Sequence, residues 1–296
     1  MGAKELSKSE PPRRVSRRKF IASGLFVVAG LAVGADAVVF EPKRLRAEKI
    51  RFPVQGLGAP LNGYRIAFLS DFHYPNCIDD EFIQRAFAMA ADFEPDLIVL
   101  GGDFIHCASR EYVAGRPVPK MATAFGQLSA PDGVVAVLGN HDHWFNAPGI
   151  RDSLRSLNIE LLENRHLDIE RGAAKLAVAG TGDFWEGEID LKSAFGGIAP
   201  ETPRILLQHN PDFAEVFPKG YRVDLQLSGH THGGQVRLPF GPALILPTRY
   251  GNKYRAGLVQ GPRHPVYVTR GVGVSSPIPL RFCCPPEVTL IELTSA

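Results

Sequence analysis

The sequence predicts an α/β domain in which buried β-strands alternate with helices. Two observations support this. Short apolar runs that suit buried strands recur along the chain, and amphipathic or polar stretches that suit helices and loops separate them. Strands that are apolar along their whole length need cover on both faces, so we expect a layered fold. The clearest runs are residues 65–70, 97–100, 134–138, 204–207 and 225–228.

Residues whose side chains bind metals or protons follow each of these runs. Because the ends of neighbouring strands meet at one edge of a sheet, we expect these fragments to converge. Alternate residues of an extended segment point the same way, so both ends of an Asp-x-His or His-x-His fragment can reach one ion or two neighbouring ions. The fragments are Asp71-Phe72-His73, Gly101-Gly102-Asp103, Gly139-Asn140-His141-Asp142, Gln208-His209-Asn210 and Gly229-His230-Thr231-His232.

Helices and further strands are predicted between and after these runs. Residues 80–93 carry an apolar helical face, and Asp79 or Asp80 is suited to cap that helix. Shorter helices are predicted at residues 122–128 and 149–157. A hairpin is predicted from residues 167–170 and 175–179, split by Arg171-Gly172, and the closing strands are residues 266–269 and 288–292.

The first forty residues predict export. Residues 1–19 carry seven Lys/Arg and two Glu, and Ser16-Arg17-Arg18-Lys19-Phe20-Ile21 matches a twin-arginine signal ahead of the apolar segment 21–39. Ala35-Asp36-Ala37 resembles a cleavage site, and an uncleaved membrane anchor is the alternative. The organisation predicted is a leader at 1–40, a connector at 41–62 and one domain at 63–296. The twin-arginine translocase is the expected partner, and the periplasm or cell envelope the expected location.

Charge and cysteine content exclude some classes. The chain has a net charge of +2, but residues 20–296 carry 26 Lys/Arg against 29 Asp/Glu, so no basic surface for nucleic acid is expected. Four cysteines in 296 residues are not a disulfide scaffold. Four unpaired thiols are expected, with a Cys77–Cys107 bridge as the alternative. No feature of the sequence fixes the oligomeric state.

The fragments suit the hydrolysis of phosphate esters. Such a reaction needs a neutralised phosphate, an activated water and a stabilised leaving oxygen, and two divalent ions about 3.5–4 Å apart supply all three. The ligands must combine carboxylate, imidazole and amide oxygen, and ligands of this kind suit Mn, Fe or Zn. The residues that offer this combination are Asp71, His73, Asp103, Asn140, His209, His230 and His232.

The order of the fragments resembles that of the calcineurin-like metallophosphoesterases. The chain as a whole resembles the exported branch of this family, whose members carry a twin-arginine signal. That branch is similar to a group that includes UDP-2,3-diacylglucosamine pyrophosphatases. The resemblance implies a two-sheet β-sandwich flanked by helices, with the metal site at the carboxyl ends of the strands. It implies a first ion on Asp71, His73 and His232, and a second on Asn140, His209 and His230. Asp103 and a hydroxide that attacks phosphorus would bridge the two ions.

The resemblance assigns two further roles. His141 would lie over the phosphate and polarise it or protonate the leaving oxygen. Asp142 would orient His141 through a hydrogen bond. We interpret His106, His143, His166 and His264 as structural. Asp183 also follows a glycine at the end of an apolar run, as Asp103 does, but the order of the fragments favours Asp103 as the bridging ligand.

Substrate contacts stay open at this point. Aromatic residues follow two of the loops, at Trp144-Phe145 and Phe184-Trp185, and packing is the interpretation favoured for them. Residues 239–242 and 278–280 are candidates for an apolar lip that suits a substrate in a membrane surface. The arginines suited by type to contact phosphate are Arg249, Arg255, Arg270 and Arg281.

The leading functional hypothesis is hydrolysis of a phosphodiester or pyrophosphate bond in a lipid or nucleotide-sugar-lipid head group. The alternatives are a phosphomonoesterase or nucleotide phosphodiesterase that scavenges phosphate, the pyrophosphatase of lipid A synthesis, and a metal-holding envelope protein without catalysis. The lipid A alternative conflicts with the leader, because that reaction takes place on the cytoplasmic side.

Overall fold

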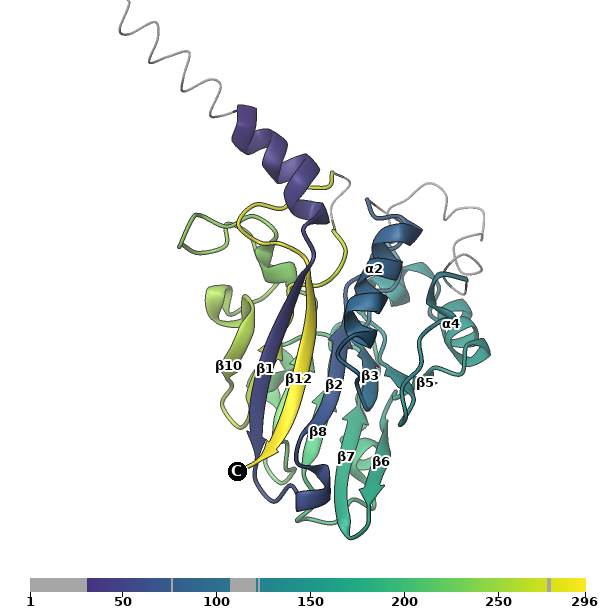
Figure 1. Cartoon of the computed structure of the whole chain (residues 1–296). Helices are drawn as coiled ribbons and strands as arrows, with labels where there is room; N and C mark the ends of the chain where they lie inside the picture. The colour runs from purple at the N-terminus through teal and green to yellow at the C-terminus, as the bar shows by residue number, and fades with distance from the viewer. Residues whose placement is uncertain (1–30, 76, 107–120, 122, 276–277) are drawn as a thin grey trace, which may run out of the picture.

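The computed structural model describes residues 31–75, 77–106, 121, 123–275 and 278–296. Two mixed six-stranded sheets form its centre (Figure 1). In order, the first sheet contains β1 (Arg46–Val54), β12 (Glu287–Ser295), β2 (Tyr64–Leu69), β3 (Leu97–Leu100), β4 (Val134–Ala136) and β5 (Glu160–Leu161). The second contains β10 (Gly257–Gln260), β11 (Pro265–Val268), β9 (Leu225–Ser228), β8 (Arg204–Leu207), β7 (Ala174–Gly180) and β6 (Arg165–Arg171).

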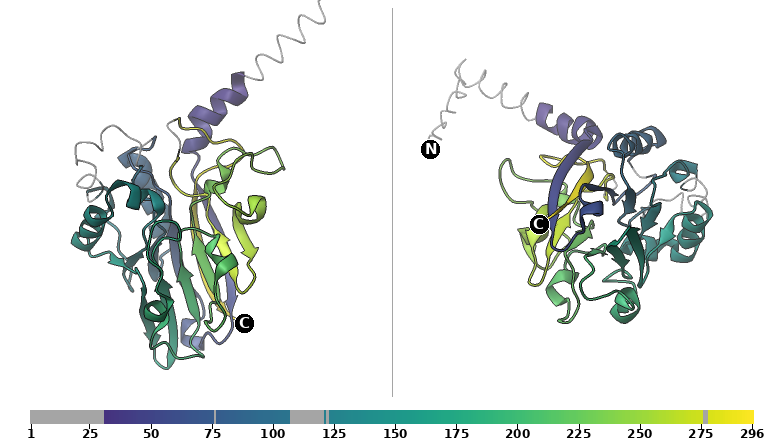
Figure 2. Two further views of the ribbon diagram at one scale, coloured as in Figure 1. Left: turned by 180° about the vertical axis from the view of Figure 1, so that it is seen from behind. Right: turned by 60° about the horizontal axis from the view of Figure 1, so that its bottom comes forward.

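Helices cover the outer faces of both sheets (Figure 2). The α-helices are α2 (Asp80–Ala91), α4 (Asn140–Ser156), α5 (Leu191–Phe195) and α6 (Phe213–Val216). Short π- or 3₁₀-helical segments are η1 (Asp36–Phe40), η2 (Glu41–Lys43), η3 (Ala59–Leu61), η5 (His232–Gly234) and η6 (Gly251–Tyr254). The structure thus confirms the predicted two-sheet sandwich flanked by helices.

The alternation of side chains along β2 builds two layers of the core. Ile66 and Phe68 point between the sheets, where they pack with Val178 and Leu207 of the second sheet. Ala67 and Leu69 belong to the other face, which packs against α2 and α4. A strand with two buried faces is apolar throughout, which is why the runs are continuous rather than alternating in polarity.

The predicted strands and helices are largely confirmed, with different ends. Helix α2 begins after Asp79, whose side chain accepts a 2.9 Å hydrogen bond from the N–H of Phe82. Helix α4 begins nine residues earlier than predicted, at Asn140, and the backbone breaks at Asn146 with φ −167°. The helix predicted at 122–128 falls partly outside the described residues. Cys107 also lies outside the described residues, so the alternative of a bridge between Cys77 and Cys107 stays a prediction.

The segment predicted as a connector is part of the first sheet. Within residues 41–62, β1 pairs with β12 in parallel over nine residues, from the pair Arg46 and Glu287 to the pair Val54 and Ser295. The connector prediction failed because β1 lies at the edge of the sheet. Most of its residues are exposed or half-buried, so the strand lacks the apolar run that marks the others.

The end of the predicted leader is docked on the domain. The side chains of Ala37 and Glu41 are buried. The N–H of Arg281 donates to the carbonyl of Ala37 over 2.9 Å, and the N–H of Cys284 donates to the Glu41 carboxylate. Among the described residues, no helix is both long and apolar enough to traverse a bilayer.

Candidate metal centre

The predicted ligands come from the carboxyl ends of five strands, three in one sheet and two in the other. Strands β2, β3 and β4 are parallel neighbours, and so are β8 and β9. Their carboxyl ends all lie at the same end of the sandwich, the upper end in Figure 1. The structure therefore brings together residues as far apart in the sequence as Asp71 and His232, which are 161 positions apart.

The seven predicted ligands form two clusters that share one carboxylate. In each cluster of acidic and histidine side chains, the ligand atoms lie within 4.8 Å of one another. The first cluster is Asp71, His73, Asp103 and His232, and the second is Asp103, His209 and His230. Asn140 joins the second cluster, since its Oδ1 lies 2.9 Å from Nδ1 of His230.

Asp103 lies between the two clusters. Its Oδ2 is 3.5 Å from Nε2 of His73 and 3.3 Å from Nε2 of His209, one histidine from each cluster. Its Oδ1 accepts a 2.9 Å hydrogen bond from the backbone N–H of His141. This is the placement that a carboxylate shared by two ions requires.

Backbone carbonyls orient two of the histidines. Nδ1–H of His209 donates to the carbonyl of Gly101 over 2.7 Å, which leaves Nε2 directed at Asp103. Nε2–H of His230 donates to the carbonyl of Pro247 over 2.9 Å, which leaves Nδ1 directed at Asn140. A carbonyl only accepts, so each bond fixes one tautomer and presents a lone pair to the cluster.

The donor set fits divalent cations. Two buried polar atoms of the ligands have no hydrogen-bond partner within the described part of the chain: Oδ2 of Asp71 and Nε2 of His209. Nε2 of His73 and Nε2 of His232 face each other at 2.8 Å. Buried groups left in this state cost free energy, and cations would satisfy the oxygen and nitrogen lone pairs that converge here.

Burial keeps most of these imidazoles neutral. It lowers the pKa of His73 and of His232 well below the ordinary value, and the pKa of His230 to about 3. Neutral imidazole is the form that binds metals. His209 differs: burial works against its protonation, but the Asp103 carboxylate raises its pKa well above the ordinary value. A cation beside Asp103 would replace that proton.

The ligand backbone is strained. Five of the ligands adopt the left-handed region, which costs about 1–3 kcal/mol for a residue other than glycine and recurs at functional sites. The φ angles are 57° at Asp71, 47° at His73, 52° at Asp103, 68° at His230 and 50° at His232.

Glycines of the motifs let the chains approach closely. A Cβ on Gly139 would lie 2.2 Å from Oδ1 of Asp103, and a Cβ on Gly229 would lie 2.1 Å from Oδ2 of Asp71. Both distances are shorter than any van der Waals contact. These two glycines are therefore part of the ligand geometry rather than simple turn residues.

Asp142 does not have the role that was expected for it. Its Oδ1 accepts hydrogen bonds from the N–H groups of Phe104 and Ile105, at 2.9 and 3.2 Å, and its Oδ2 accepts one from Gly139 at 3.0 Å. As the third residue of α4, its side chain turns back to the backbone at the start of that helix. Asp142 joins the Asp103 loop to the start of α4 and does not orient His141 by a side-chain bond.

His141 and His106 complete the histidine group. The ring of His141 lies 4.6 Å from the ring of His73 and 5.7 Å from that of His106, with which it is nearly parallel. His73, His106 and His141 form a further group with ligand atoms within 4.8 Å of one another. The structure thus places His106 beside the clusters, and its interpretation as a structural residue stays a prediction.

Two half-exposed tryptophans border the clusters. The ring of Trp144 lies 4.9 Å from that of His141, and the ring of Trp185 lies 4.3 Å from that of His230. Nε1–H of Trp144 donates to Glu186 over 2.7 Å. Asp183 accepts the N–H groups of Trp185 and Glu186, so it shapes this border and is not a member of either cluster.

Three of the four candidate arginines have partners within the protein. Arg281 is fully buried and donates to the carbonyls of Cys284, Arg270 and Gly273. Arg270 pairs with Glu48 and Glu287. Arg255 donates to the carbonyl of Gly241, and Arg249 is exposed.

Comparison with known proteins decides the family. The family model described as calcineurin-like phosphoesterase matches residues 64–234, the part that contains both clusters. The chain belongs to the calcineurin-like phosphoesterase family. It is a metal-dependent phosphoester hydrolase.

Three relatives share most of their length with this phosphoesterase. The metallophosphoesterase YkuE of Bacillus subtilis is 30% identical over 290 residues, which cover 96% of this chain and 99% of YkuE. Phosphodiesterase YaeI of Escherichia coli is 36% identical over 235 residues, which cover 78% and 82%. The UDP-2,3-diacylglucosamine pyrophosphatase LpxG of Chlamydia trachomatis is 27% identical over 308 residues, which cover 85% and 90%.

The shared carboxylate predicts how metal binding responds to substitution. We expect the purified protein, refilled with Mn²⁺, to hold about two ions per chain. His209→Ala should retain about one ion, and Asp103→Ala should lose both, since its carboxylate faces both clusters. Metal content by mass spectrometry is the measurement. His166→Ala is the control, because that half-buried ring contacts Ala194 outside the clusters. Two ions in Asp103→Ala would contradict the shared-carboxylate geometry.

The contacts of Asp142 predict a loss of stability. Asp142→Ala removes the acceptor of three N–H groups, and each buried donor left unsatisfied costs roughly 1–3 kcal/mol. The free energy of unfolding in urea, measured with chelator present, should fall by at least that amount. His141→Ala is the neighbouring control and should change it by no more than about 0.5 kcal/mol. Equal stability of the two variants would restore an orienting role for Asp142.

Proposed function

We propose that this phosphoesterase hydrolyses a phosphodiester or pyrophosphate bond, with a lipid or nucleotide-sugar-lipid head group as its substrate. The observation that carries the proposal is the complete pair of clusters around Asp103, with His141 beside them and with two tryptophans and an apolar cavity at their borders. The relatives support it, because one is a phosphodiesterase and another is a pyrophosphatase of a diacylated nucleotide sugar.

The ligands divide as the clusters do. Asp71, His73 and His232 would hold one ion, Asn140, His209 and His230 would hold the other, and Asp103 would contact both. Bound ions of Mn, Fe or Zn would supply charge neutralisation at phosphorus and activation of water. The carbonyls of Gly101 and Pro247 hold two of the imidazoles in the tautomers that this requires.

His141 is suited to act on the leaving oxygen. It is half-buried at the start of α4, and its backbone N–H is held by Asp103. Its ring packs between the rings of His73 and Trp144, at 4.6 and 4.9 Å, and so faces the border where a substrate enters. From there it would polarise the phosphate or donate a proton to the departing oxygen.

Phosphate scavenging is the second candidate, as a phosphomonoesterase or a nucleotide phosphodiesterase. The two aromatic side chains at the border favour it, since Trp144 and Trp185 offer faces on which a nucleobase can stack. This candidate uses the same ligands and the same His141, and it differs only in the substituent that the border accepts.

The proposal predicts a preference for diesters. The full-length protein, chelated and refilled with Mn²⁺, should hydrolyse bis(p-nitrophenyl) phosphate with a kcat/KM at least about tenfold above that for p-nitrophenyl phosphate. His141→Ala should lower kcat by roughly 10²–10⁴ while metal content stays constant, with His166→Ala as control. Monoester preference would favour scavenging, and no metal-dependent turnover of either ester would overturn the diester proposal.

We also propose that the enzyme acts outside the cytoplasmic membrane, and the twin arginines support this. Cells that make the full chain should hold it in the envelope fraction, whereas a double variant, Arg17→Lys and Arg18→Lys, should stay in the cytoplasm although its charge is unchanged. Fractionation with a cytoplasmic marker measures this. Equal distribution of the two proteins would refute export by this route.

A further inference from the structure

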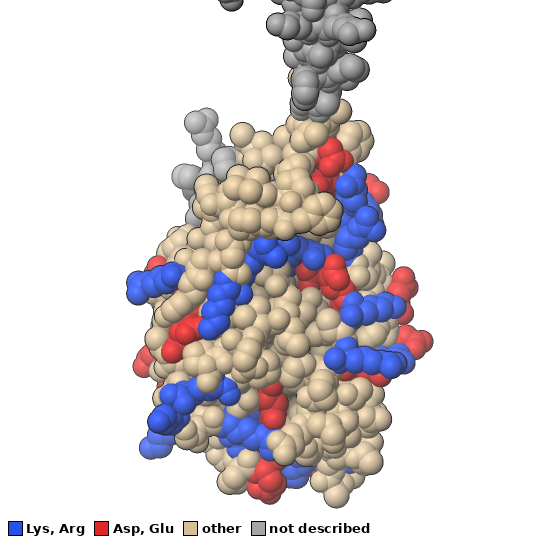
Figure 3. Space-filling model, turned by 90° about the vertical axis from the view of Figure 1, so that its left-hand side faces the viewer, with Lys and Arg blue, Asp and Glu red and all other residues tan. Residues whose placement is uncertain are grey.

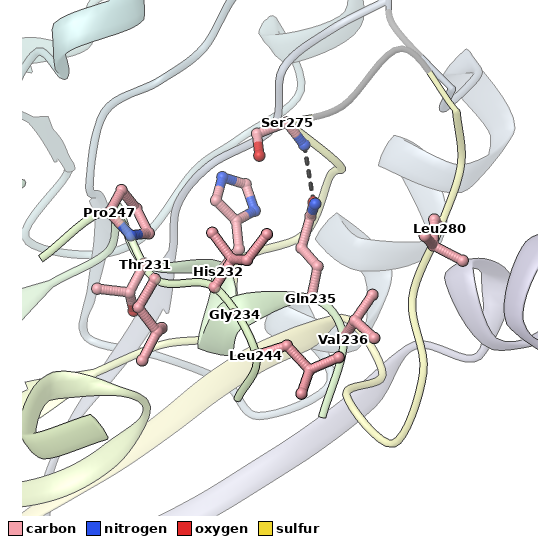
Figure 4. Close-up of a pocket in the computed structure, with 11 residues that line it drawn as sticks. Thr231, His232, Gly234, Gln235, Val236, Leu244, Pro247, Ser275 and Leu280 are labelled. Carbon is pink, nitrogen blue, oxygen red and sulfur yellow. Dashed lines mark hydrogen bonds between the residues drawn. The ribbon is translucent and has the colours of Figure 1, made fainter. Parts of the chain in front are cut away.

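An apolar cavity of about 490 Å³ opens beside the first cluster. His232 and Thr231 form part of its wall, so the cavity reaches one of the ligand side chains. The volume lies within the range of roughly 300–1,000 Å³ typical of small-molecule sites. Figure 4 shows His232 and Gln235 at the centre, Leu244 and Val236 below them and Leu280 to their right. The apolar side chains of the wall are Val236, Leu244, Ile245, Leu246, Pro247 and Leu280.

Two polar side chains of the wall are already engaged within the protein. Oε1 of Gln235 accepts a 2.9 Å hydrogen bond from the N–H of Ser275, as Figure 4 shows. The Thr231 hydroxyl donates to the carbonyl of Arg255 over 3.0 Å. The wall therefore offers little to a polar ligand and much to an apolar one.

A short hairpin builds the outer rim of the cavity. Arg237 pairs with Ala243, and the N–H of Leu244 donates to the carbonyl of Val236 over 3.1 Å. The hairpin carries Phe240 at its tip, fully exposed, and Ile245 next to its base is 81% exposed. Single exposed apolar residues are common, but a group around the mouth of an apolar cavity indicates a binding surface.

The cavity and the leader share one loop. Leu280 lines the cavity, while the next residue, Arg281, donates its N–H to the carbonyl of Ala37 in η1. The helical segment at residues 31–40, which contains Ala37, exposes the side chains of Leu31, Val39 and Phe40. Figure 1 places the leader helix at the upper end of the molecule, and the upper part of the face in Figure 3 is mostly uncharged.

We propose that this cavity holds an alkyl or acyl chain of the substrate diester while its phosphate lies at the two clusters. This inference rests on the proposed phosphodiesterase function and names the substituent on the His232 side. From the phosphate, the alkyl or acyl chain would pass His232 and enter the cavity between Leu244 and Leu280. The apolar rim of the cavity and the leader would face the lipid surface that supplies the substrate.

A series of p-nitrophenyl phosphodiesters with methyl, butyl and octyl groups tests the proposal. The full-length Mn²⁺-loaded protein is used without detergent, because a detergent tail would compete for the cavity. Burial of a methylene is worth about 0.8 kcal/mol, which is about fourfold in kcat/KM. We expect a gain of two- to fourfold per methylene until the cavity is full, and octyl at least about 100-fold above methyl.

Substitutions in the cavity should change this ratio. Leu244→Ser and Ile245→Trp should lower the octyl-to-methyl ratio of kcat/KM at least about tenfold, by removing apolar wall and by filling the space. Val216→Ser is the matched control, because Val216 on α6 is as exposed as Leu244, at 54% against 59%. The rate of each variant on the methyl ester reports whether its metal site is folded. If one of the two cavity variants is misfolded, the octyl-to-methyl ratio of the other variant tests the proposal.

The outcomes separate the two proposals. Hydrolysis of all three esters at equal kcat/KM would overturn the cavity proposal and leave the phosphodiesterase function standing. No hydrolysis of any of them, with two ions bound, would overturn the proposed function itself. A chain-length gain that persists in both Leu244→Ser and Ile245→Trp would place the chain elsewhere and also refute the cavity.

Discussion

The shared carboxylate of Asp103 is the contact on which the rest of the site depends. It follows β3 of the first sheet, yet it faces His209 from β8 of the second sheet at 3.3 Å. Through its other oxygen it holds the start of α4 at the N–H of His141. One side chain thus links both sheets and a flanking helix, so the packing of the sandwich sets the spacing of the ligands. A relative slip of the sheets would remove the centre before it exposed the core.

The close spacing of the ligands constrains the backbone that carries them. Five ligands adopt positive φ, and Gly139 and Gly229 make room for carboxylates that a Cβ would displace. Conformations of this kind persist only where the surrounding structure determines them. Here the surroundings are Asp142, which ties three N–H groups of two loops, and the buried guanidinium of Arg281, which binds carbonyls of the loop after Thr269. Both side chains are buried polar groups that hold main chain in place through hydrogen bonds.

Much of the fold and the ligand set could be predicted from the sequence, because both depend on local signals. Apolar runs mark strands with two covered faces, and polar fragments directly after them mark the edge where they meet. Three features had no such signal. Strand β1 lies at an edge and lacks an apolar run, and the partners of Asp142 depend on how two loops meet in space. The position of His106 beside His141 depends on the left-handed turn at Asp103, which composition does not reveal.

The two borders of the centre differ in chemistry, and this difference bears on the reaction. Beside His141 and His230 lie two half-exposed tryptophans, one bonded to Glu186, which suit a planar or polar substituent. Beside His232 lies the apolar cavity. A phosphomonoester carries one substituent and would leave one border without a ligand, whereas a phosphodiester or pyrophosphate carries two. An asymmetric pair of borders on one metal centre therefore favours a substrate whose phosphate joins two unlike groups.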